Sequence, residues 1–143
     1  MDLIQLKLCD IQGRLFELSL QAGYDSEDFM KQFMRSRVAR DLDSEYNRMQ
    51  WAGEEYLLEE FADECPQTQN GNAQYDREVM YWAGYLYRYW HILTKEPSRA
   101  IYAQAPAKTM NINYLMFHTM APELAIEDLK ELHQQKKRSK NKK

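Results

Sequence analysis

Apolar residues recur every three or four positions through the first part of the chain. Between residues 2 and 22 this stripe is formed by Ile4, Leu8, Ile11, Leu15, Leu18 and Ala22. The spacing places these residues on one face of an α-helix, whereas a strand would need strict alternation. Gly23 suits the position that ends such a helix, and Asp25 or Ser26 can cap the next one. The pattern therefore predicts a first helix over residues 2–22 and a second directly after it.

Two further segments precede a polar loop. The second predicted helix buries a face made of Phe29, Met30, Phe33, Met34, Val38 and Leu42. The third, over about residues 44–64, carries its apolar positions at Tyr46, Met49, Ala52, Tyr56, Leu57 and Phe61. The outer face of this helix is acidic. A loop is predicted over residues 65–75, with a turn signal at Asn70-Gly71.

The fourth predicted helix, about residues 76–94, carries apolar or aromatic residues on every side. One stripe consists of Val79, Ala83, Leu86, Trp90 and Leu93, and the other sides are covered by Tyr81, Trp82, Tyr85, Tyr87 and Tyr89. A helix that is apolar all round is usually buried. We therefore expect this helix to be central, with its tyrosine hydroxyls hydrogen-bonded. A stacking platform for nucleobases is the alternative, although such platforms normally lie among cations.

Helical patterns continue to the end of the chain. Short helices are predicted after Pro97 and over about residues 107–118, and Pro122 suits the first turn of a final helix. The chain has 143 residues with only 5 Gly and 4 Pro, which favours one domain and disfavours a sandwich or barrel. The predicted fold is all-α, a single compact bundle of about six or seven helices over residues 1–135. Residues 136–143 are expected to be a disordered basic tail.

One short segment recurs along the chain. Residues 49–56 read Met-Gln-Trp-Ala-Gly-Glu-Glu-Tyr, and residues 80–87 read Met-Tyr-Trp-Ala-Gly-Tyr-Leu-Tyr. A small Ala-Gly step beside a tryptophan lets two helices approach closely. A duplicated helical hairpin and a coincidence of shared packing needs are both open interpretations.

Charge is unevenly distributed along the chain. The formal net charge is −3, but residues 136–143 hold six cations and no acid, so residues 1–135 carry −9. The body should repel nucleic acid and anionic membrane, whereas the tail should attract both. Lys136, Lys137, Arg138 and Lys140 are therefore the candidate nucleic-acid contacts. No apolar run is long enough to span a membrane, no signal peptide is recognisable, and two cysteines are too few for a disulfide scaffold. The expected compartment is the cytoplasm.

Motifs that specify a reaction are missing from the sequence. The three histidines lack zinc-type spacing, and no phosphate-binding glycine loop or nucleophile elbow occurs. Carboxylates four positions apart on the third predicted helix indicate a solvated face rather than a cation site. We predict no metal, no cofactor and no catalytic residue. Arg88 and His91, three apart on the aromatic helix, could form an enzyme site, and structural hydrogen bonding is the other interpretation.

The last third of the chain carries the one family resemblance. From Tyr81 the chain reads Tyr-Trp-Ala-Gly-Tyr-Leu-Tyr-Arg-Tyr-Trp-His, followed by Ser-Arg-Ala-Ile-Tyr over 98–102, Tyr114, Phe-His-Thr over 117–119, and Ala-Ile-Glu-Asp-Leu over 125–129. This order of motifs resembles a small helical domain of bacterial accessory proteins. These proteins are often encoded beside toxins with an ADP-ribosyltransferase-like fold. Lys95-Glu96-Pro97 stands where the family commonly has a glycine-containing turn. The resemblance covers about residues 79–130 and implies an antitoxin-like or accessory role, without an active site.

These observations predict a non-catalytic protein-binding protein, antitoxin-like or an accessory component of a bacterial toxin–antitoxin or defence-related locus. The expected partner is another protein, and self-association is open. The predicted contact surface joins the acidic face of the third helix to exposed aromatics, and comprises Glu54, Glu55, Glu59, Glu60, Tyr85 and Tyr89. The alternatives are a nucleic-acid-associated regulator that uses the basic tail and an enzyme with the Arg88/His91 site. For the glutamates, a solvated face that keeps the protein soluble is the competing interpretation.

Overall fold

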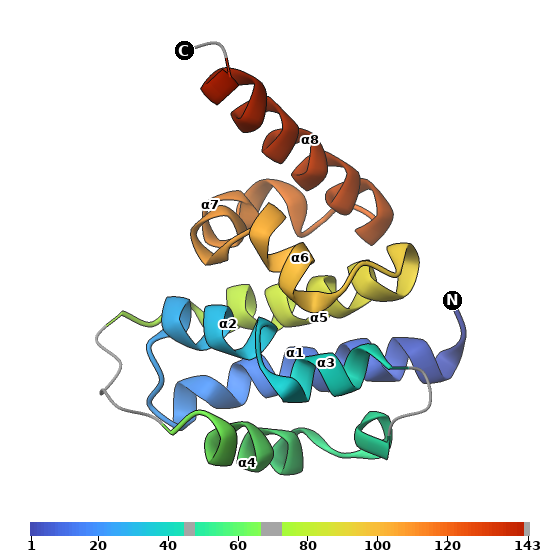
Figure 1. The fold of residues 1–143 in the computed structure, drawn as a ribbon, viewed down its shortest axis with the longest axis vertical. Helices are drawn as coiled ribbons and strands as arrows, with labels where there is room; N and C mark the ends of the chain where they lie inside the picture. The colour runs from blue at the N-terminus through green and yellow to red at the C-terminus, as the bar shows by residue number, and fades with distance from the viewer. Residues whose placement is uncertain (45–47, 67–72, 142–143) are drawn as a thin grey trace.

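The computed structural model describes residues 1–44, 48–66 and 73–141, and these ranges contain helices and no strand (Figure 1). An all-α fold is thus confirmed for the described part of the chain. The elements are α1 (Leu3–Gln21), α2 (Ser26–Met34), α3 (Arg37–Asp43), the 3₁₀ helix η1 (Arg48–Trp51), α4 (Glu54–Glu64), α5 (Arg77–Thr94), α6 (Ser98–Gln104), α7 (Ala107–Phe117) and α8 (Pro122–Asn141).

The described residues form eight α-helices, so the prediction of six or seven is wrong. The second predicted helix is two helices, because Ser36 interrupts it. The Ser36 hydroxyl accepts a hydrogen bond from the Ala39 backbone N–H at 3.1 Å and caps α3. The next two backbone N–H groups, of Arg37 and Val38, donate to the Glu64 carboxylate on α4 at 2.7 and 3.3 Å. A distant side chain therefore completes the cap.

The third predicted helix begins later than its apolar pattern indicates. Gly53 is the N-cap of α4, and the short helix η1 precedes it. Residues 45–47, within this prediction, lie outside the described residues. The repeated segment consequently has two different structures, since residues 49–56 cross from η1 into α4 and residues 80–87 lie inside α5.

Helices α1 and α5 approach each other closely because each presents a glycine. A Cβ atom at Gly84 would lie 2.6 Å from the Gln12 backbone oxygen, and one at Gly13 would lie 2.7 Å from the Tyr81 ring. The Gln12 amide donates to the Gly84 carbonyl at 2.9 Å across the same contact. α5 also packs against α6, α7 and α8, and α1 packs against α4. In Figure 1, α1 lies between α4 and α5.

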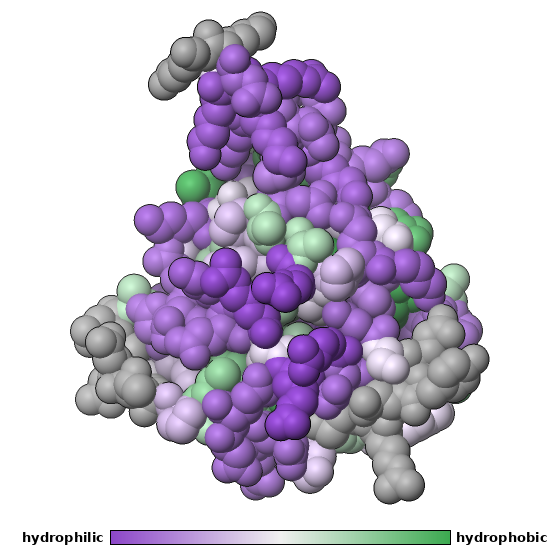
Figure 2. Space-filling view, in the orientation of Figure 1, coloured by the Kyte–Doolittle hydropathy of each residue, from purple (hydrophilic) through white to green (hydrophobic). Residues whose placement is uncertain are grey.

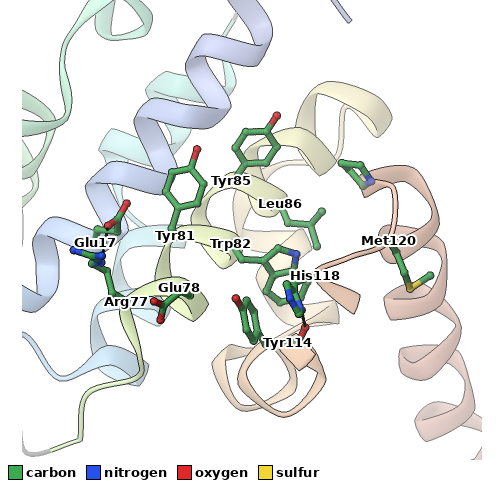
Figure 3. A pocket seen from close by; sticks show the side chains of 11 residues that line it. Glu17, Arg77, Glu78, Tyr81, Trp82, Tyr85, Leu86, Tyr114, His118 and Met120 are labelled. Atoms are coloured by element: carbon green, nitrogen blue, oxygen red, sulfur yellow. Dashed lines mark hydrogen bonds and ion pairs between the residues drawn. The ribbon is translucent and has the colours of Figure 1, made fainter. Parts of the chain in front are cut away.

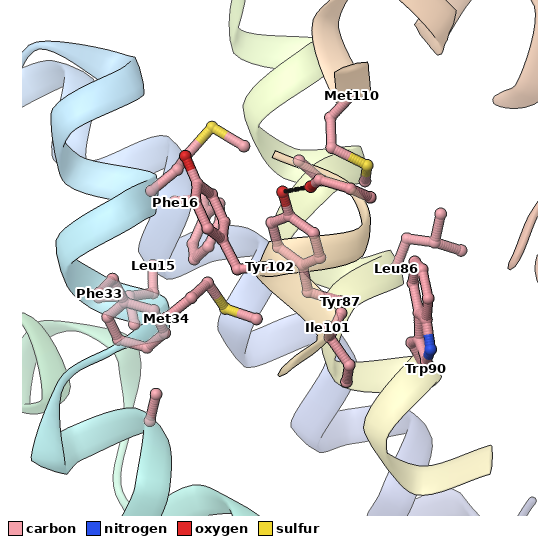
Figure 4. Close-up of a cluster of buried hydrophobic side chains, with 14 of the residues drawn as sticks. Leu15, Phe16, Phe33, Met34, Leu86, Tyr87, Trp90, Ile101, Tyr102 and Met110 are labelled. Carbon is pink, nitrogen blue, oxygen red and sulfur yellow. Dashed lines mark hydrogen bonds between the residues drawn. The ribbon is translucent and has the colours of Figure 1, made fainter. Parts of the chain in front are cut away.

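The core is rich in aromatic rings contributed by the first helices. Phe16, Phe29, Phe33 and Phe61 meet with ring centroids 5.3–5.7 Å apart, mostly edge to face. Tyr87 extends this cluster from α5, and its hydroxyl donates to the Ala105 carbonyl at 2.5 Å (Figure 4). Among the described residues that are buried or half-buried, every buried side-chain nitrogen or oxygen atom has a hydrogen-bond partner.

The last helix extends away from the body (Figure 1). The sequence predicts a disordered tail from residue 136, whereas α8 continues through Asn141, and Lys142 and Lys143 lie outside the described residues. Figure 2 shows hydrophilic side chains covering this end of the molecule. Most of the predicted loop, residues 67–72 with Asn70-Gly71, is likewise outside the described residues. No helix in the described ranges is long and apolar enough to cross a membrane.

Candidate binding site

A pocket of about 620 Å³ lies between α5, the end of α7 and the turn into α8, with α1 at one edge (Figure 3). We call it the aromatic pocket. Helix α5 supplies the most lining residues because its turns place Arg77, Glu78, Tyr81, Trp82 and Tyr85 on the side that adjoins α7. Helix α7 contributes Tyr114, and His118 follows at its C-terminal end.

One wall of the pocket is a group of three rings. The Trp82 and Tyr114 rings meet nearly edge to face at a centroid distance of 5.7 Å. The exposed His118 ring stacks on Tyr114 at 4.3 Å, with an angle of 13° between the planes. The His118 Nδ1–H donates to the Tyr114 carbonyl at 2.7 Å, which holds the imidazole in place. These contacts orient flat, partly accessible rings around the cavity.

Three tyrosines form a ladder along α5. The Tyr81 and Tyr85 ring centroids are 6.0 Å apart, and those of Tyr85 and Tyr89 are 6.2 Å apart. The Tyr81 hydroxyl donates to Asp10 and the Tyr89 hydroxyl donates to Glu123. The hydrogen bond to Glu123, with burial, raises the pKa of Tyr89 to about 12. The Tyr81 and Tyr89 phenols therefore stay protonated and act as hydrogen-bond donors at neutral pH.

Charged groups stand at the other end of the aromatic pocket (Figure 3). Glu17 of α1 pairs with Arg77, whose Nε atom lies 3.5 Å from the carboxylate. Glu78 is exposed at the start of α5, and no cation among the described residues pairs with it. The pocket thus combines several aromatic rings with one paired and one unpaired carboxylate.

The predicted Arg88/His91 pair lies in the core instead of at this pocket. Arg88 is 0% exposed, and its three nitrogens donate to Gln12 at 2.8 Å, Asp43 at 2.6 Å and Ser98 at 3.3 Å. Asp43 in turn accepts hydrogen bonds from both the backbone N–H and the hydroxyl of Ser98. These contacts join α5 to α1, α3 and α6, and each of the three guanidinium nitrogens has a protein acceptor.

His91 belongs to the same buried network. Its Nδ1 lies 2.6 Å from the Glu96 carbonyl, and its Nε2 lies 3.1 Å from the Asp43 carbonyl. Both ring nitrogens thus face backbone carbonyl oxygens of the protein itself. Asp43, which links Arg88, His91 and Ser98, is not singled out by any spacing in the sequence. It lies 45 positions before Arg88, so only the tertiary fold reveals its role.

The predicted contact residues do not form one surface. Glu54, Glu55, Glu59 and Glu60 lie on α4, which packs on α1, whereas the two tyrosines are on α5. Glu55 and Glu59 are exposed beside one shallow groove, and Glu60 lines another. Tyr85 is half-buried in the aromatic pocket, and Tyr89 is only 8% exposed. Tyr89 therefore does not present the exposed ring that the sequence predicts.

The remaining candidates lie apart from this pocket. Lys136, Lys137, Arg138 and Lys140 are exposed on the last turns of α8. No group of three or more His, Cys, Asp or Glu side chains that could hold a metal occurs among the described residues. Cys9 and Cys65 are free, and burial raises the pKa of the Cys9 thiol to about 12, which makes it unreactive at neutral pH.

Some residues of the aromatic pocket belong to motifs that the sequence shows, but the sequence does not indicate that they form one site. Tyr114 and His118 are the Tyr-x-x-x-His of the resemblance, and their four-residue spacing predicts contact on one helix. Their meeting with Trp82 depends on how α7 crosses α5, which no local pattern reveals. Comparison with known proteins gives no further guidance, since no family model, curated protein or solved structure matches this chain.

Proposed function

We propose that this chain is a non-catalytic protein-binding protein, antitoxin-like or an accessory component of a bacterial toxin–antitoxin or defence-related locus. An exposed apolar surface on α7 supports this function. Ile112, Leu115 and Met116 are 77%, 81% and 71% exposed. They are three and four positions apart, so they project from one side of the helix. Large apolar side chains gathered on a surface are typical of protein–protein contact. We call these three residues the α7 face.

The α7 face adjoins the aromatic pocket. Leu115 precedes His118 by three positions, which makes them neighbours on the helix surface. A partner segment that covers Leu115 would therefore also reach the imidazole and Tyr114 behind it. Such a surface has an apolar centre and aromatic anchors at its edge, the composition of residues that dominate binding energy in interfaces.

Catalysis by Arg88 and His91 has less support. Their nitrogens contact acceptors of the protein itself, and Arg88 is fully buried. A substrate would have to displace Asp43, which would leave a buried charge without its partner. The pair therefore supports the structural interpretation, in which it joins helices.

We also propose that α5 is the central helix of the fold. Ten of its eighteen residues are buried, and it contacts α1, α6, α7 and α8. The same helix lines the aromatic pocket with Tyr81, Trp82 and Tyr85. Core packing and pocket geometry are thus linked through one element.

Co-expression with the product of the neighbouring gene tests the proposed function. We expect the two proteins to co-purify in a fixed ratio, and growth arrested by the neighbour to resume when this chain is present. A matched chain with Leu115→Glu, which places a charge on the α7 face, should rescue poorly although it folds. Absence of both a complex and rescue with the wild-type chain would overturn the proposal.

A nucleic-acid-associated regulator is the second candidate, favoured by the exposed cations on the projecting end of α8. Replacing Lys136, Lys137 and Lys140 by Gln would remove three cations while keeping the helix. If this candidate holds, the wild-type chain binds a DNA or RNA duplex with an affinity that falls steeply with salt, and the variant has a shallower salt dependence. Equal, weak binding by both chains would rule out this role for the tail.

A further inference from the structure

The aromatic pocket brings aromatic rings and carboxylates together, which is the composition of a site for an organic cation. Tyr81, Trp82 and Tyr114 form its walls, and Glu17 and Glu78 stand at one end (Figure 3). The faces of Trp and Tyr rings attract cations because the π-electrons make them negative. We propose that the pocket binds the guanidinium group of an arginine presented by the partner protein, an inference that rests on the protein-binding function proposed above.

Hydrogen bonds strengthen the attraction of the ladder for a cation. Tyr81 donates to Asp10, and Tyr89 donates to Glu123. A hydroxyl that donates to a carboxylate is polarised toward negative charge at its oxygen. Tyr81 itself lines the aromatic pocket, and Tyr89 lies further along α5 beyond Tyr85. Asp10 is also held by Arg14 at 2.9 Å, whereas Glu123 is exposed next to the pocket's far edge at Pro122.

Glu78 supplies the ion-pair partner that an arginine needs. Glu17 is already occupied by Arg77, but Glu78 has no cation beside it among the described residues. A guanidinium can form two parallel hydrogen bonds to a carboxylate while its flat face stacks on an aromatic ring. An ammonium group lacks the planar fork, so the combination of rings and carboxylate favours arginine over lysine.

A nucleobase of DNA or RNA is also flat and could stack on these rings, but the charge of the protein disfavours it. Residues 1–135 carry a net charge of −9, which repels the phosphates that accompany nucleobases. The volume of about 620 Å³ lies within the range of pockets that enclose compact ligands. It leaves space for the arginine side chain together with neighbouring atoms of the segment that presents it.

Titration with a model arginine tests the assignment. The probe is N-acetyl-arginine N-methylamide, and the readout is the set of Trp indole N–H resonances of the ¹⁵N-labelled full chain. We expect the Trp82 indole, assigned by Trp82→Phe, to shift with saturation in the millimolar range. The citrulline analogue has nearly the same shape but no charge, and it should bind at least about fivefold more weakly. Equal binding of citrulline, of the lysine analogue or of AMP would overturn the arginine assignment.

A pair of conservative variants locates the site. Glu78→Gln should weaken arginine binding roughly threefold to tenfold, whereas Glu55→Gln on α4 should leave it unchanged. Both substitutions are at exposed positions, so folding is expected to persist and is checked by circular dichroism. No arginine binding together with co-purification of the neighbouring protein would overturn this inference and leave the proposed function standing. Arginine binding without any protein complex would overturn the proposed function and leave the cation site.

Discussion

At the residue scale, Arg88 is a charged side chain that joins helices within the core through hydrogen bonds. Its guanidinium is fully buried, and Gln12, Asp43 and Ser98 accept its hydrogen bonds. Burying an ion pair gives little net stability, but removing one partner is costly because the other is left uncompensated. The sequence places Arg88 on an aromatic helix and favours hydrogen bonding there. It does not reveal Asp43, because the partner is brought in by the fold.

Replacing Arg88 should therefore destabilise the protein strongly. We expect Arg88→Met, which keeps much of the volume, to lower the free energy of unfolding by about 3–5 kcal/mol in urea titrations. The double variant with Asp43→Asn should lose less than the sum of the two single changes. Arg77→Met, at an exposed position, serves as the control and should change stability by no more than about 0.5 kcal/mol. An Arg88→Met loss as small as the control's would contradict the buried network.

Glu96 makes the stability of the fold depend on pH in the acidic range. Burial alone would raise its pKa, but hydrogen bonds from Lys130, Trp90, Gln104 and Thr94 outweigh it and lower the pKa from 4.5 to about 2. Because the folded state holds the carboxylate charged, this stabilisation is complete above the ordinary value and is lost as pH falls toward 2. Urea unfolding of wild type between pH 6 and pH 2 should show this loss, and Glu96→Gln should flatten it. Parallel curves for both proteins would contradict this role.

At the element scale, the sequence predicts helices better than it predicts their ends. The stripe from Ile4 to Ala22 corresponds closely to the bounds of α1, but Ile4 and Ala22 at its ends are exposed. The buried face of α1 also includes residues outside the stripe, namely Cys9, Gln12, Gly13, Phe16 and Ser19. The stripe over residues 29–42 has the right apolar positions, but α2 ends at Met34 and Ser36 caps a new helix inside the stripe. Local capping competes with helix continuation, and here a carboxylate from α4 favours the break.

The contact between α1 and α5 depends on Gly84. Alanine there would place a methyl group 2.6 Å from the Gln12 carbonyl oxygen, so the two helices would have to move apart. We expect Gly84→Ala to cost about 1–3 kcal/mol by thermal and chemical unfolding. Gly53→Ala is the matched control, since only the Glu55 side chain lies near its added carbon, at 3.8 Å. Equal effects at the two positions would show that α5 is not held closely against α1.

The acidic surface of α4 has its own test. Glu55 and Glu59 are exposed and one turn apart, so Glu55→Lys with Glu59→Lys should change the free energy of unfolding by no more than about 0.5 kcal/mol. If α4 contacts a basic partner, the same variant should associate more slowly, and its rate should depend less on salt. Stopped-flow association with the co-purifying protein measures both. An unchanged rate would identify α4 as a solvated surface.

At the scale of the whole molecule, the fold class can be predicted from the sequence, whereas the candidate site cannot. Periodicity alone predicts an all-α fold, since helical stripes run along nearly the whole chain. The aromatic pocket could not be predicted, because it forms where α5, α7 and the turn into α8 meet. The residues of the predicted contact surface are divided between α4 and α5, and α1 lies between these two helices (Figure 1). Charge is also separated in space, with exposed cations on the projecting end of α8.

We propose that the α7 face and the adjoining aromatic pocket together bind a protein. The most direct measurement is calorimetric titration of the purified neighbouring gene product with the wild-type chain and with Ile112→Ser, Leu115→Ser. Both substitutions are at exposed positions, so the variant should remain folded. We predict a saturable complex with the wild type and an affinity reduced at least about tenfold in the variant, which corresponds to 1.4 kcal/mol. Equal affinities, or no complex with the wild-type chain, would show that this surface does not bind the neighbouring protein.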